Sequence, residues 1–100
     1  MPYINEKARK ELDDCIENMV ECLTHGNDLT TNEFGIICGE INYTFSRILA
    51  KTMGKTTYTK IAVATGVLEN IKQEFYRRIA TPYEDKKMIE NGDIKEYKGL

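Results

Sequence analysis

Residues 30–52 read TTNEFGIICGEINYTFSRILAKT, and this stretch decides the fold class. Apolar side chains recur in it at steps of three and four residues, which is the period of an amphipathic α-helix and not of a strand. Thr30 and Glu33 have the spacing of a capping box, in which each side chain accepts a hydrogen bond from the other residue's backbone N–H. Gly54 is a helix terminator. The pattern predicts a helix over residues 31–52, with an inward apolar row of Phe34, Ile37, Cys38, Ile41, Phe45, Ile48 and Leu49.

The flanking segments show the same period. A first helix is predicted over residues 5–24, with Asn5 as its N-cap and Gly26 as its left-handed stop. A third is predicted over residues 58–80. Thr81 and Pro82 then resemble a second helix start, because proline loses nothing at the first helical position. A short fourth helix is expected to follow and to end at residues 91–92.

These elements predict an all-α fold, a compact bundle of three long helices plus a short C-terminal helix. Residues 1–92 are expected to form a single domain, and residues 93–100 a tail or a docking arm. Chains this short bury a modest fraction of their surface, so we expect a homo-oligomer. The linker at residues 54–57 is short, and the helices on its two sides are therefore expected to be antiparallel neighbours.

Small residues line one flank of each of these two helices. Gly35 and Gly39 share a flank with Asn42, and Gly66 shares one with Glu69. We expect the backbones to approach closely there, which brings Asn42 and Glu69 within hydrogen-bonding range. A buried Glu69 would have to be paired or protonated. Two interpretations stay open: a polar contact that fixes the helix alignment, or a small polar ligand held between the helices.

The helix predicted over residues 31–52 has a second face on which residues recur at helical spacing. Residues Ile36, Glu40, Tyr43 and Arg47 follow one another at steps of four, three and four, opposite the apolar row. Aromatic and apolar residues on an outer face are often covered by a partner. The spacing favours a subunit interface, and a solvated face is the alternative.

The end of the third helix holds the densest group of aromatic and basic residues, in EFYRR at 74–78 and PYEDKK at 82–87. Guanidinium groups bind phosphate through two parallel hydrogen bonds, and tyrosine rings offer surfaces on which a base can stack. This composition predicts contacts with an anionic nucleotide. The alternative is a set of structural ion pairs in which Glu74, Glu84 and Asp85 neutralise the same cations.

Composition excludes several classes of function. Fourteen basic and sixteen acidic residues give a net charge of −2, so there is no strong case for binding DNA or RNA. No window is apolar enough for a membrane span. Cys15, Cys22 and Cys38 lie in apolar helical patterns and are expected to be reduced core thiols of a cytoplasmic protein. His25 is the only histidine, and no catalytic residue, metal site or cofactor is predicted.

The segments GEINY at 39–43, GVLE at 66–69, EFYRR, PYEDKK and NGD at 91–93 resemble a family of short uncharacterised proteins encoded by bacteriophages and bacteria. The resemblance extends over residues 3–93. It implies a phage or prophage origin and brings no function with it.

The leading hypothesis is a non-enzymatic, homo-oligomeric protein that binds a small anionic, nucleotide-derived ligand. By analogy of size and helical class, it is compared with phage sponges that sequester nucleotide immune signals. The alternatives are a structural or regulatory adaptor that binds another protein through the outer face of the second helix, and a helical metal-dependent nucleotide hydrolase. The candidate ligand-binding residues are Asn42, Tyr43, Arg47, Glu69, Tyr76, Arg77, Arg78, Tyr83 and Lys86.

Overall fold

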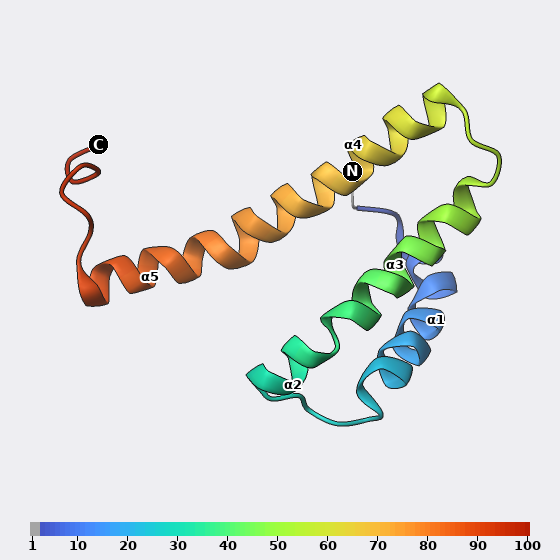
Figure 1. The fold of residues 1–100 in the computed structure, drawn as a ribbon, viewed down its shortest axis with the longest axis horizontal. Coiled ribbons are helices and arrows are strands. Elements are labelled where there is room, and N and C mark those ends of the chain that lie inside the picture. Colours follow the sequence, from blue (N-terminus) through green and yellow to red (C-terminus); the bar gives the residue numbers. More distant parts are fainter. Residues whose placement is uncertain (1–2) are drawn as a thin grey trace. The chain divides into compact units, whose positions relative to one another are not determined.

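The structure is a computed structural model that describes residues 3–100 (Figure 1). Within that range every regular element is a helix, which confirms the predicted all-α class. The chain divides into two compact units, residues 3–64 and residues 65–100. The prediction of one domain over residues 1–92 stays a prediction, and its first two residues lie outside the described part.

Helix α1 spans Glu6–Thr24 and begins where the sequence predicts. The Asn5 side chain accepts a hydrogen bond from the Ala8 backbone N–H at 2.9 Å, so it caps one of the free donors of the first turn. The helix ends at Thr24, as predicted, but the left-handed stop begins one residue before the predicted Gly26. His25 has a left-handed backbone, with φ 56°, and its N–H donates to the Glu21 carbonyl.

The predicted second helix is two helices, α2 (Thr31–Ile36) and α3 (Cys38–Met53). Both bonds of the capping box are present, from the Thr30 N–H to Glu33 at 3.1 Å and from the Glu33 N–H to the Thr30 hydroxyl at 3.2 Å. The prediction of one unbroken helix is wrong because Ile37, at φ −86° and ψ 2°, interrupts it. Gly35 and Gly39 flank this break, and glycine weakens a helix.

Helices α4 (Tyr58–Phe75) and α5 (Thr81–Asn91) are joined without a break by the π-helical segment η1 (Tyr76–Ala80), as Figure 1 shows. Helix α5 does begin at Thr81, but the prediction that Thr81 caps a separate helix is wrong: Thr81 is itself helical, and its N–H donates to the Tyr76 carbonyl five residues earlier. Pro82 has no N–H and would press against the carbonyl of Arg78 in a regular α-helix. The i→i+5 bonding of η1 loosens the helix directly before this proline.

The C-terminal end agrees with the sequence. Helix α5 stops at Gly92, whose φ of 86° is a conformation that side chains rarely adopt. Residues 93–100 contain turns and no helix, with the N–H groups of Tyr97 and Lys98 both donating to the Ile94 carbonyl at 3.2 Å. Whether this tail docks on a partner stays a prediction.

No residue in the described range is buried. Leu12 in α1 is 50% exposed and Ile71 in α4 is 54% exposed, although both belong to rows with clear helical spacing. The amphipathic pattern is thus present, but neither unit covers it from within. The bundle, the antiparallel hairpin and the oligomer remain predictions. Of the helices in residues 3–100, none combines the length and apolarity needed to cross a membrane.

The cysteines differ from expectation in their environment. Cys15, Cys22 and Cys38 are free thiols, as predicted, but all three are exposed rather than placed in a core. The Cys38 thiol donates to the Phe34 carbonyl at 3.4 Å, one turn earlier along the chain. Their apolar neighbours in the sequence are exposed too, which is why the expected core position is not found.

Candidate functional site

The predicted polar contact between Asn42 and Glu69 involves residues of different units, and it stays a prediction. Within its own helix, Asn42 accepts a hydrogen bond from the Ser46 hydroxyl at 3.2 Å. Glu69 accepts one from Gln73 at 3.2 Å and lies 3.9 Å from the Lys72 ammonium. Each side chain therefore has a local partner.

The glycine flanks border open space. A β-carbon placed on Gly35, Gly39 or Gly66 would meet no atom within 4 Å in the described part of the chain. The close helix approach that these residues predict has no counterpart within either unit.

The two arginines at the end of α4 share one carboxylate partner. Glu74 pairs with both Arg77 and Arg78, the latter at 3.4 Å. The Glu74 side chain is only 23% exposed, whereas both arginines extend into solvent. The structure thus realises the ion-pair alternative for these two arginines. A phosphate would have to compete with the Glu74 carboxylate for the same guanidinium groups.

Tyr76 is engaged in the same way. Its hydroxyl donates to a carboxylate oxygen of Glu84 at 2.9 Å, across the π-helical segment. This hydrogen bond, together with the negative charge of Glu84, raises the pKa of Tyr76 because both favour the protonated phenol. Three of the predicted ligand residues, Tyr76, Arg77 and Arg78, are therefore already bound to carboxylates.

The Tyr83 ring lies beside Lys87, a residue outside the predicted ligand set. The Lys87 ammonium lies 5.6 Å from the centroid of the Tyr83 ring and also 3.1 Å from a carboxylate oxygen of Glu90. The i, i+4 spacing of Tyr83 and Lys87 was the signal for this contact. Lys86, which was predicted, makes no ion pair in the described residues.

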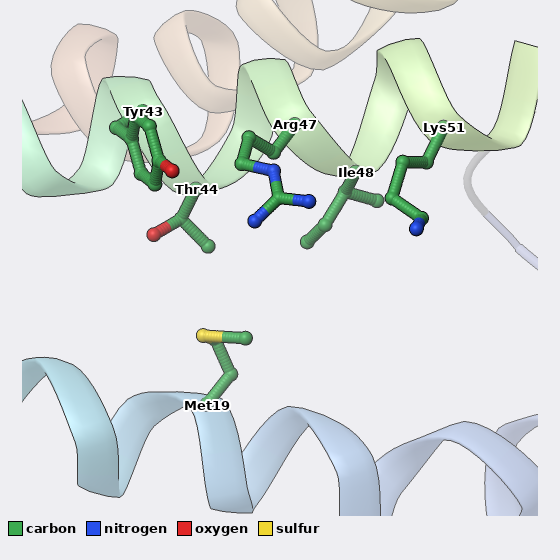
Figure 2. Close-up of a pocket in the computed structure, with 6 residues that line it drawn as sticks. All are labelled: Met19, Tyr43, Thr44, Arg47, Ile48 and Lys51. Atoms are coloured by element: carbon green, nitrogen blue, oxygen red, sulfur yellow. The ribbon is translucent and has the colours of Figure 1, made fainter.

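A different group of cations borders a groove between α1 and α3 in the first unit (Figure 2). The groove has a volume of about 270 Å³. Met19 projects into it from α1, and the other lining side chains come from α3. The Arg47 guanidinium lies 6.0 Å from the centroid of the Tyr43 ring. The lining consists of Met19, Tyr43, Thr44, Arg47, Ile48 and Lys51, which includes two cations and no acidic residue.

Helical spacing explains this lining. Tyr43, Arg47 and Lys51 follow at steps of four residues and form one row along α3. Thr44 and Ile48 form the adjacent row. Ile48 belongs to the predicted apolar row, so the face that carries Tyr43 and Arg47 shares the groove with that row. Met19 adds an apolar side chain from α1.

Residues 1–94 match the model of the family described as Domain of unknown function (DUF6899). The chain belongs to this family. No curated protein and no solved structure matches it.

For this family member, sequence reasoning found Tyr43 and Arg47 but missed Lys51, although Lys51 continues the same i, i+4 spacing. Met19 was predicted only as part of the apolar row of the first helix, and Thr44 was not singled out. Across residues 3–100, no group of three or more histidine, cysteine or acidic side chains is placed to hold a metal ion. The arrangement offers aromatic stacking surfaces, cations and apolar contacts, which is the chemistry of binding an anion that carries a ring.

Proposed function

We propose that this chain is a non-enzymatic binding protein that acts as a homo-oligomer and holds a small anionic, nucleotide-derived ligand. The observation that carries the proposal is the absence of any buried residue in the described range, in helices whose apolar spacing is regular. Helices in proteins gain most of their stability when such a face is covered. A second copy of the chain presents matching apolar rows and supplies that cover.

The ligand class is argued from the contact between the Tyr43 ring and the Arg47 guanidinium. An aromatic ring stacks on a base, while a neighbouring cation binds phosphate. Such binding requires no reactive group. In a phage, such a protein would act by sequestering a nucleotide signal of the host immune system, and we include this role in the proposal.

A second candidate is an adaptor that binds another protein. Ile36 is 78% exposed and Tyr43 is 64% exposed, and both belong to the face that the sequence predicted to be an interface. Large exposed apolar and aromatic side chains are enriched where proteins dock. This candidate predicts no effect of nucleotides on stability.

Thermal melts with a panel of nucleotides and cyclic nucleotides separate the two candidates. A ligand that binds the folded protein stabilises it by mass action, by about 3 kcal/mol at a concentration one hundred times its Kd. We expect at least one compound of the panel to raise the melting temperature. The corresponding nucleoside, which lacks the phosphate, should raise it less. Melting temperatures that stay constant across the panel contradict ligand binding and favour the adaptor.

A further inference from the structure

We propose that the ligand site is the groove between α1 and α3, and that it binds one nucleobase joined through its sugar to a phosphate, as in a nucleoside monophosphate. In this site Arg47 and Lys51 bind the phosphate, and Tyr43 stacks on the base. This inference rests on the proposed function and goes further, because it names the site and its ligand.

The cations of the groove and of the α4–α5 segment differ in the charge that is available to a ligand. In the α4–α5 segment, Arg77 and Arg78 share the Glu74 carboxylate, and Lys87 pairs with Glu90. In the groove, neither Arg47 nor Lys51 pairs with a carboxylate of the described residues. An incoming phosphate therefore meets two uncompensated cations in the groove, whereas at the α4–α5 segment it must displace acidic partners.

The placement of the side chains along α3 suits one ligand. Arg47 and Lys51 are one helical turn apart, about 6 Å along the axis, so that both can reach one phosphate. Tyr43 lies one turn before Arg47, and its ring already has the guanidinium beside it. In Figure 2 the Arg47 side chain extends from α3 toward α1, with Thr44 and Ile48 beside it and Met19 opposite.

The size and polarity of the groove also fit such a ligand. The volume of about 270 Å³ lies just below the usual range for small-molecule sites, which limits the ligand to a single nucleotide. Met19 and Ile48 provide apolar contacts for the base. The Thr44 hydroxyl adds one group that can donate to or accept from a polar ligand edge.

Isothermal titration calorimetry with AMP, GMP, CMP and UMP tests the site in the full-length protein, with adenosine and inorganic phosphate as partial ligands. At least one monophosphate should bind, and it should bind tighter than either partial ligand. The double variant Arg47→Gln/Lys51→Gln should weaken that binding about tenfold or more. Arg9→Gln/Lys10→Gln removes the same charge from α1 outside the groove and should leave affinity unchanged.

Two further variants keep the test decisive. Lys51→Glu reverses one charge while keeping a good helix former, and it should abolish binding even if the double variant fails to fold. Arg77→Gln/Arg78→Gln should bind as the unchanged protein does. If this second pair loses binding while the groove variants keep it, the groove proposal is overturned and the proposed function stands.

The remaining outcomes are equally clear. If no monophosphate binds, yet a cyclic nucleotide raises the melting temperature, the groove proposal falls and the proposed function stands. If no nucleotide of any kind binds or stabilises the protein, both fall together. Binding of inorganic phosphate as tight as that of the monophosphates would refute the role of the Tyr43 ring.

Discussion

The Tyr76 hydroxyl donates a hydrogen bond to Glu84 at 2.9 Å. Tyr76 is the first residue of η1, and Glu84 lies in the first turn of α5. The contact joins the EFYRR and PYEDKK segments within one continuous helical rod. It occupies a tyrosine that the sequence assigns to ligand stacking. The aromatic and basic composition of this region therefore has a structural use that does not involve a ligand.

Glu84→Gln should lower the pKa of Tyr76 toward its ordinary value of 10.0, because the carboxylate charge that opposes phenolate formation is removed. In the unchanged protein the raised pKa adds stability below pH 10.0, and this contribution is lost as the pH rises through the folded value. The titration of the Tyr76 ring, followed by NMR, measures the shift. Glu90→Gln is the control, since Glu90 pairs with Lys87. An unchanged Tyr76 titration in Glu84→Gln would show that the contact does not persist in solution.

Thr30→Ala should destabilise the fold by about 1 kcal/mol, because it removes the hydroxyl that caps α2. Thr31→Ala, one residue later, is the matched control. The hydrogen bonds from Thr30 hold the pKa of Glu33 below its ordinary value of 4.5. Glu33 therefore adds stability above pH 4.5 that is lost as the pH falls through the folded pKa. Urea denaturation at neutral and acidic pH measures both effects, and equal values for the two alanine variants would refute the capping role.

The helix starts at residues 6 and 31 were predictable because they depend on groups within three residues of each other, such as Asn5 with Ala8 and Thr30 with Glu33. The break at Ile37 was not, since the apolar spacing continues through it. Pro82 was misread for a related reason. A proline preceded by threonine is a common helix start, and the sequence alone does not show that η1 carries the helix across it.

Pro82→Ala distinguishes the two interpretations of that proline. If Pro82 lies inside a continuous helix, alanine restores an N–H donor and relieves the clash, and stability should rise by about 1 to 3 kcal/mol. Chemical denaturation measures the change, and amide hydrogen exchange at Thr81 reports whether the π-type bond is replaced. Unchanged or reduced stability would instead support the helix start that the sequence predicts.

Gly66→Ala should stabilise the protein by about 1 kcal/mol, because Gly66 lies inside α4 and an added β-carbon meets no atom within 4 Å. Ala62→Gly, one turn earlier, should have the opposite effect of similar size. Thermal denaturation of the two variants checks both signs. A marked destabilisation by Gly66→Ala would mean that another helix packs against this glycine, as the small-residue flank predicts.

The candidate site was only partly predictable. The spacing of Tyr43 and Arg47 marked a functional face, and their contact at 6.0 Å is found within α3. The contribution of Met19 was hidden because it comes from another helix, and periodicity within one helix does not say which helix it faces. For Arg77 and Arg78, the sequence left ion pairing and ligand contact open. In the structure each oxygen of the Glu74 carboxylate contacts one of the two arginines, which favours ion pairing.

Native mass spectrometry of the protein purified from its own host tests the central claim most directly, because one spectrum reports both assembly and retained ligand. Our account predicts a multiple of the 11.5 kDa chain mass, with added mass from a small anionic compound that is released on unfolding. A bare single chain at every protein concentration would contradict it.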